Sequence, residues 1–183
     1  MLITPVLLER EPLVFAEMLV PEAMDYGDGV VQVGTLPVEG QADLVPEHRG
    51  HRQIVHDIRL RASFTGRFEV PCARCVEPVI HPLEGEFDLI FRPLGVDGGA
   101  SEYAVSTAET EIGYYHQSGL LLEDVVREQV LLGLPARTLC KNDCKGLCPR
   151  CGENLNEKDC SCDAAPVDLR WSALSDLRSR LKQ

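Results

Sequence analysis

The cysteines are the residues of this chain whose type and spacing could do chemistry. They fall into four close pairs, and three of these pairs lie within residues 140–162. Two thiolates a few residues apart can reach one metal ion without straining the backbone, and two such pairs complete the tetrahedral sphere that zinc accepts. The pattern therefore predicts two structural zinc ions with four thiolate ligands each. The eight candidate ligands are Cys72, Cys75, Cys140, Cys144, Cys148, Cys151, Cys160 and Cys162.

The redox environment decides whether such a cluster forms disulfides or binds metal. The N-terminal stretch MLITPVLLEREPLVF lacks the basic start and the long apolar run of a secretory signal. No stretch of the chain approaches the roughly 18 consecutive apolar residues of a membrane span. We therefore expect a cytoplasmic protein, in which thiols stay reduced and clustered cysteines serve metal binding or catalysis.

The four pairs can combine into two sites in three ways. We favour a grouping in which the last two pairs share one ion, because a short loop then closes that site at a small cost in entropy. The main alternative joins the two middle pairs and leaves the outer pairs to meet each other. The favoured grouping is Cys72, Cys75, Cys140 and Cys144 for the first site, and Cys148, Cys151, Cys160 and Cys162 for the second.

The string CPRCG at residues 148–152 is the most specific of these elements. It resembles a zinc knuckle, in which Gly152 permits the tight turn that points backbone N–H groups at sulfur. The string PCARC at residues 71–75 resembles half of a zinc deaminase signature, but that chemistry also needs a histidine followed two residues later by glutamate, and none of the five histidines has one.

A catalytic zinc keeps an open position for water, whereas four thiolates close the coordination sphere. Zinc-protease, phosphate-loop, nucleophile-elbow and dinucleotide-binding strings are absent from the sequence. We therefore expect a non-enzymatic protein without catalytic residues.

The formal charge of the chain is −11. Eight thiolates would subtract eight further charges and two Zn²⁺ ions would restore four, which gives about −15. A chain this acidic does not bind nucleic acid through its overall charge. Four basic residues near the cysteines could contact a partner, or could only offset the charge of the thiolates. They are Arg74, Lys141, Lys145 and Arg150.

The clearest secondary structure precedes the C-terminal cysteines. Apolar and polar residues alternate over residues 58–70 and 79–91, which predicts two strands that each have one buried face. Pairing Val70 with Val79 matches the apolar faces and also sets Arg61 opposite Asp88. We therefore predict an antiparallel hairpin with Cys72 and Cys75 at its tip. The arginines of the first strand could instead form an RNA-binding stripe, but cross-strand neutralisation is the simpler interpretation.

Other segments are less regular. Valine-rich runs and turn residues over 29–45 predict further strands, and residues 93–118 predict a long connection. The pattern changes to LLLEDVVREQVLL over 120–132, which predicts a helix on the sheet, with Ser118 as N-cap and a stop at Gly133–Pro135. After the cysteines, Asp163 is a candidate cap for a last helix that contains Trp171.

These elements predict an α+β fold with an antiparallel sheet core, a few packing helices and a C-terminal cysteine-rich, zinc-binding segment. We expect the sheet and helix core to occupy residues 1–135. The cysteine-rich segment and the last helix would occupy residues 136–183 and dock on this core.

The linear order of the motifs resembles the YceD family of bacterial and plastid proteins, which are linked to the accumulation of large-subunit ribosomal RNA. The resemblance runs from about residue 50 to the C-terminus. The ending VDLRWSAL has Leu169 where the family usually has proline. The matching strings are Cys72-Ala73-Arg74-Cys75, Leu132-Gly133-Leu134-Pro135, Cys140 to Cys144, Lys145 to Asn156, and Cys160 to Cys162.

The resemblance implies a non-enzymatic accessory factor for large-subunit rRNA or ribosome biogenesis, and it carries over no catalytic residues. It also implies that the last four cysteines can be lost as a unit, which agrees with the favoured grouping. Since assembly factors and ribosomal proteins are typically basic, we expect an acidic chain to bind one of them or a pre-ribosomal particle rather than naked rRNA. The alternative function is that of a thiol-based redox or metal-responsive protein, which would release zinc on oxidation.

Overall fold

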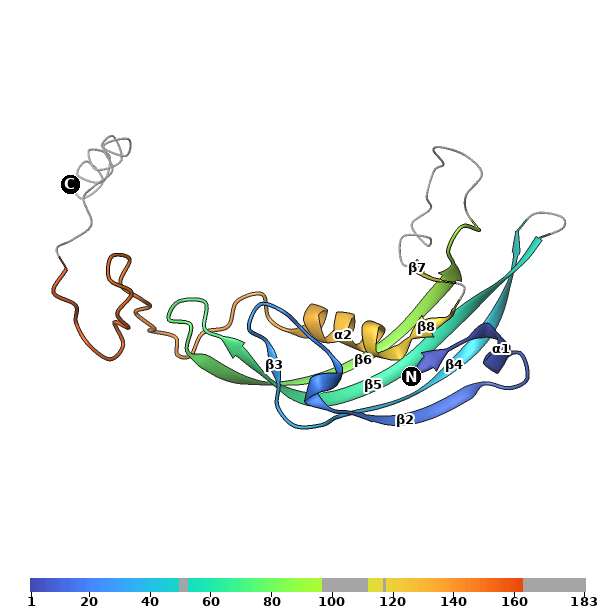
Figure 1. The fold of residues 1–183 in the computed structure, drawn as a ribbon, viewed down its shortest axis with the longest axis horizontal. Coiled ribbons are helices and arrows are strands. Elements are labelled where there is room, and N and C mark those ends of the chain that lie inside the picture. Colours follow the sequence, from blue (N-terminus) through green and yellow to red (C-terminus); the bar gives the residue numbers. More distant parts are fainter. Residues whose placement is uncertain (50–52, 97–111, 117, 163–183) are drawn as a thin grey trace, which may run out of the picture.

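The computed structural model describes residues 1–49, 53–96, 112–116 and 118–162. A long curved sheet of six strands forms the body of this part, and a helix lies along its concave face (Figure 1). The strand order is β2-β4-β5-β6-β7, and β3 also pairs with β5. The sheet strands are β2 (Leu13–Leu19), β3 (Val31–Gln32), β4 (Leu36–Arg49), β5 (Gln53–Pro71), β6 (Pro78–Pro93) and β7 (Ile112–Tyr115).

Shorter elements complete the described part. The strands β1 (Leu2–Ile3) and β8 (Leu120–Leu121) form a small second sheet. The helices are α1 (Pro5–Leu8) and α2 (Leu122–Gly133), with a 3-10 turn η1 at Pro21–Ala23. Among the described residues, no helix combines the length and the apolar composition that crossing a bilayer requires.

The β5–β6 hairpin has the register that the sequence predicts. Val70 lies opposite Val79 and Arg61 opposite Asp88, and both strands extend beyond the predicted bounds. The ion pairs of the outer face are different from the predicted one, because these side chains reach diagonally. Arg61 pairs with Asp43 on β4, while the Nε of Arg59 donates to the Oδ1 of Asp88 at 2.8 Å.

The sheet is mixed rather than purely antiparallel. β7 runs parallel to β6, with Ile112 opposite Ile90, and it falls inside the segment that the sequence analysis expected to be a connection. Its string of four residues is too short to show a clear alternation. Residues 97–111 of that segment lie outside the described residues, as does the predicted last helix with Asp163 and Trp171.

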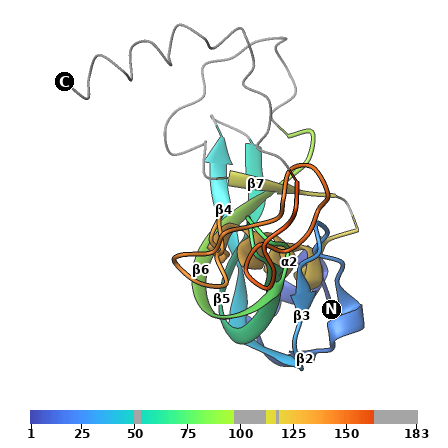
Figure 2. The same cartoon turned by 90° about the vertical axis from the view of Figure 1, so that its left-hand side faces the viewer.

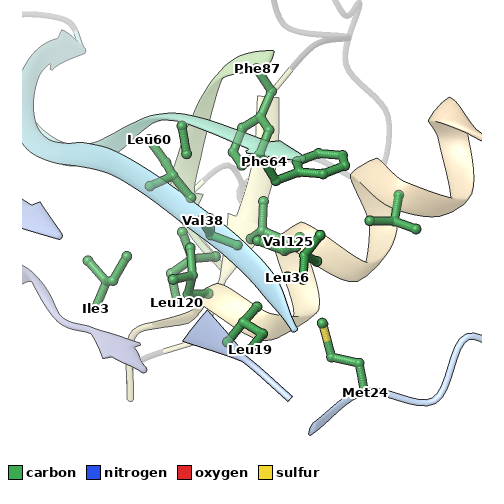
Figure 3. Packing of buried hydrophobic residues seen from close by; sticks show 14 of the residues in the cluster. Ile3, Leu19, Met24, Leu36, Val38, Leu60, Phe64, Phe87, Leu120 and Val125 are labelled. Atoms are coloured by element: carbon green, nitrogen blue, oxygen red, sulfur yellow. The ribbon is translucent and has the colours of Figure 1, made fainter. Parts of the chain in front are cut away.

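The main hydrophobic core of the described residues lies between the concave face of the sheet and α2. Val38, Leu60, Phe64 and Phe87 from the strands meet Val125 from the helix (Figure 3). The rings of Phe64 and Phe87 pack with their centroids 6.5 Å apart. Complete burial of a side chain such as Leu60, which is 0% exposed, contributes about 1.5–3 kcal/mol. The predicted packing of this helix on the sheet is therefore confirmed.

The start of α2 differs from the prediction that made Ser118 its N-cap. The helix begins at Leu122, with Leu121 as a cap residue that makes no side-chain hydrogen bond. Leu120 and Leu121 instead form β8, which pairs with β1, and the N–H of Leu122 donates to the carbonyl of Met1 at 3.0 Å. A carbonyl more than a hundred residues away thus accepts the first N–H of the helix. The helix ends at Gly133, within the predicted stop.

Two Arg–Asp pairs join β5 and β6, and they differ in burial. Asp57 accepts from the Nε of Arg92 at 3.2 Å and from its Nη2 at 2.9 Å, and these side chains are 5% and 4% exposed. The Arg59–Asp88 pair has the same chemistry, but its side chains are 44% and 46% exposed. A buried charge that loses its partner is costly, whereas an exposed one is solvated by water.

We therefore expect Arg92→Met to lower the free energy of unfolding by about 3–5 kcal/mol, because it leaves Asp57 charged and buried. Arg59→Met, the matched control, should cost less than about 1 kcal/mol. Urea unfolding of both variants measures the difference. Equal costs would show that the buried pair has no special part in holding this end of the hairpin.

Candidate metal centre

The structure gathers the eight cysteines into two groups of four. The sulfur atoms within each group all lie within 4.8 Å of one another. This is the grouping that the sequence analysis favoured, and the alternative that joins the two middle pairs is not the one found. The first group is Cys72, Cys75, Cys140 and Cys144, and the second is Cys148, Cys151, Cys160 and Cys162.

The sulfur separations fit a metal better than disulfides. The Sγ atoms of Cys72 and Cys144 are 3.8 Å apart, and those of Cys75 and Cys140 are 3.5 Å apart. A disulfide would need about 2.05 Å. Four sulfurs at about 2.3 Å from a tetrahedral zinc lie about 3.8 Å from one another. All eight thiols are free, so the donor set and its spacing suit Zn²⁺.

Each group contains a knuckle with the same backbone geometry. In the first, the N–H of Val76 donates to the carbonyl of Cys72 at 2.9 Å. In the second, the N–H of Gly152 donates to the carbonyl of Cys148, also at 2.9 Å. The last residue of each turn is left-handed, with φ of 64° at Val76 and 75° at Gly152. The sequence indicated only the second knuckle, because the first has no glycine.

Backbone amides in these turns favour the thiolate of the leading cysteine. The amide of Cys75, and after it that of Arg74, lowers the pKa of Cys72 to about 6. The amides of Cys151 and Arg150 lower the pKa of Cys148 to about 6 in the same way. In each group the turn therefore stabilises the ionised form of its leading thiol.

The last cysteine of the second group behaves in the opposite way. The pKa of Cys162 is raised to about 12, and the largest cause is its sulfur–sulfur hydrogen bond with Cys151. Four thiolates in so small a space repel one another, so the full set ionises only when a cation replaces the protons.

The first group brings together cysteines from two distant parts of the chain. Cys72 and Cys75 lie in the β5–β6 turn, and Cys140 and Cys144 follow α2. The N–H of Ala73 donates to the carbonyl of Thr138 at 2.8 Å. Figure 2 shows the cysteine-rich segment (orange to red) in front of this end of the sheet.

This end of the molecule has little apolar core of its own. Cys72, Cys75 and Cys144 are 2–4% exposed, and within the part of the chain that the structure describes only Val79 and Leu139 pack against them as partly buried apolar side chains. A small apolar cluster contributes little stability, and a metal ion held by the four sulfurs would add to it.

The second group is more open than the first. Cys148 is buried, Cys160 and Cys162 are half-buried, and Cys151 is exposed. The Sγ atoms of Cys148 and Cys160 are 3.4 Å apart.

The four basic residues proposed for partner binding all lie around these groups. Arg74 donates from Nη1 to the carbonyl of Cys144 at 2.7 Å, so it has a partner inside the molecule. The Nζ of Lys145 lies 3.8 Å from Asp159 in an exposed pair. Lys141 and Arg150 are exposed, and neither forms an ion pair with another described residue.

Asn156 is a residue of the centre that the sequence analysis missed. Its Nδ2 lies 3.3 Å from the Sγ of Cys144, and its Oδ1 accepts from the N–H of Lys145 at 2.9 Å. The hydrogen bond to sulfur adds to those factors that lower the pKa of Cys144. Asn156 ends the string Lys145 to Asn156 that resembles the family, but an asparagine in a polar loop gives no local signal for a contact with sulfur.

The comparison with protein families matches residues 60–178 to the family described as large ribosomal RNA subunit accumulation protein YceD. This chain belongs to the YceD family. The match covers the β5–β6 hairpin from Leu60 onward, α2 and all eight cysteines.

Among curated proteins, the large ribosomal RNA subunit accumulation protein YCED homolog 1, chloroplastic, of Arabidopsis thaliana is 34% identical over 58 residues. That alignment covers 32% of this chain and 18% of the plant protein. An uncharacterised protein of Mycobacterium tuberculosis is 31% identical over 106 residues, which cover 58% of this chain and 48% of that protein. The chain thus matches less than half the length of these relatives. No solved structure matches it.

The donor sets predict a metal content that can be measured directly. Protein purified without added metal should contain about two zinc ions per chain, since each group offers four sulfur ligands. Elemental analysis against protein concentration gives the ratio. A ratio near one would show that one group is not a site, and a ratio near zero would refute the metal centre.

The left-handed conformation of Val76 predicts an unusual gain from glycine. Val76→Gly relieves about 1–2 kcal/mol of backbone strain and gives back part of it through chain entropy, so we expect a net stabilisation of about 0.5–1 kcal/mol. The control is Ala73→Gly in the same turn, where φ is not positive, and it should destabilise by about 0.4–1 kcal/mol. Urea unfolding of the zinc-loaded variants compares them. A loss of stability in both would rule out strain at Val76.

Proposed function

We propose that this chain is a non-enzymatic accessory factor in the accumulation of large-subunit rRNA, acting as a zinc-stabilised binding module. The observation that carries the proposal is that this chain, a member of the YceD family, holds two four-cysteine groups at one end of its sheet. Four sulfur ligands leave a zinc ion no position for water, so the ions would be structural.

The charges of the described surface favour a protein partner over naked RNA. Arg59 and Arg61 on the outer face of the sheet are each paired with a carboxylate, so they form no free basic stripe. With a formal charge of −11, the chain can neutralise few phosphates, while it attracts basic proteins. We therefore propose a ribosomal protein, an assembly factor or a pre-ribosomal particle as the partner.

A deletion strain of the source organism tests this function. Loss of the chain should lower the amount of large-subunit rRNA and of large subunits in sucrose-gradient profiles, and the wild-type gene should restore both. Cys75→Ser should fail to restore them, because it removes a ligand that joins the hairpin tip to the segment after α2. Unchanged rRNA levels in the deletion strain would contradict the proposal.

The choice of partner can be tested separately. We expect weak binding of a purified large-subunit rRNA fragment at physiological salt, because few phosphates can be neutralised. A titration at two salt concentrations measures it, with Arg67→Ala, an exposed sheet residue, as the control. Submicromolar, strongly salt-dependent affinity that disappears when Arg74, Lys141, Lys145 and Arg150 become Ala would instead make the chain a direct RNA binder.

A further inference from the structure

The loop of the second cysteine group folds back onto the first group. This loop runs from Gly152 to Asp159, between two pairs of second-group ligands. The N–H of Leu155 donates to the carbonyl of Gly146 at 2.9 Å, and Leu147 forms a β-bridge with Asn154. The loop thereby lies against the short stretch that leads from Cys144 to Cys148.

The contact with the first group is made at a ligand atom. Asn156 reaches the Sγ of Cys144, and Asn154 orients it, since the Oδ1 of Asn154 accepts from the Nδ2 of Asn156 at 2.9 Å. A donor aimed at a thiolate stabilises its negative charge and fixes the direction of its lone pairs. Asn156 is therefore placed to act on the first group, although it is held in a loop that the second group closes.

A second set of contacts joins the same two regions through the backbone. The N–H of Leu147 donates to the carbonyl of Arg74 at 3.1 Å, and the guanidinium of Arg74 donates to the carbonyl of Cys144. Gly146 packs closely against the backbone of Arg74, since a Cβ at position 146 would lie 3.1 Å from the carbonyl oxygen of Arg74. The Nδ2 of Asn154 also reaches the Oε1 of Glu77, in the β5–β6 turn, at 3.3 Å.

From these contacts we infer that the two groups bind metal cooperatively, with Asn156 as the positioning residue that transmits the effect. An ion in the second group orders the Gly152–Asp159 loop and holds the Asn156 amide on the Cys144 sulfur. The first group then binds its own ion more tightly. By thermodynamic linkage, an ion in the first group raises the affinity of the second by the same factor.

The proposal rests on the zinc-binding part of the proposed function and goes beyond it. Two independent structural sites would fill and empty separately. Coupled sites hold the hairpin tip and the segment after α2 as one unit, which loses its order in one step when either ion is lost.

A double-mutant cycle on zinc affinity tests the coupling. Competition with a chromophoric chelator gives the affinity of the first group in four chains: wild type, Asn156→Ala, Cys148→Ser with Cys151→Ser, and the combination of all three changes. Changes in outer-sphere partners typically cost about 10–100-fold in metal affinity. We expect a loss of this size at the first group from Asn156→Ala alone and from the cysteine double variant alone.

In the background that lacks the second group, Asn156→Ala should lower the zinc affinity of the first group by less than about a further threefold, because the loop no longer holds the side chain in place. The control is Asn142→Ala, an exposed asparagine in the first group's own ligand loop, which should leave the affinity unchanged. Circular dichroism of each zinc-loaded variant confirms that the sheet is intact.

Two results would overturn the coupling. One is a first-group affinity that does not change when the second group is removed. The other is an Asn156→Ala penalty of equal size in both backgrounds, which would make Asn156 a local neighbour of Cys144 and no more. A wild-type chain that binds no zinc would instead refute the metal centre itself, so the two failures can be told apart.

Discussion

The pairing of β5 with β6 is the constraint on which the rest of the structure depends. It aligns residues from Ile58 to Pro71 with residues from Phe91 to Pro78 without a bulge. Because side chains alternate along a strand, this one register puts the apolar residues of both strands under α2 and the charged residues on the opposite face. The same register sets the position of the turn, and hence of the first two cysteines.

Two kinds of stabilisation act at opposite ends of this hairpin. Around Leu60 and Phe87, burial of apolar surface against α2 holds the strands. Around Cys72, the apolar cluster is small, and backbone hydrogen bonds and the four cysteine side chains of the first group lie between the distant segments. The shared backbone geometry of the two knuckles indicates that the turn exists to present sulfur, and that a left-handed residue, glycine or not, is needed to close it.

Much of the fold follows from the sequence where the pattern is local and long. The alternation over residues 58–70 and 79–91 was sufficient to set the hairpin register, and cysteine spacing favoured, among three possible groupings, the one that the structure shows. The features that could not be predicted depend on contacts between segments that are far apart in the sequence. The start of α2 depends on β1, and the ion pairs of Arg59 and Arg61 depend on which carboxylates the neighbouring strands bring within reach. The contact of Asn156 with sulfur depends on the fold of a polar loop.

The width of the sheet changes along β5, and this has a consequence for local opening. β4 pairs with β5 only as far as Phe64, and beyond it β3 covers two residues, Phe68 and Glu69. Toward the turn, β5 is therefore held mainly by β6. Amide hydrogen exchange along β5 should be slowest near Leu60 and become faster toward Cys72. The difference in exchange rate should decrease when the first cysteine group binds a metal ion. The cysteine-bearing end of β5 would then be a region whose rigidity depends on metal binding, while the strands around Leu60 stay ordered.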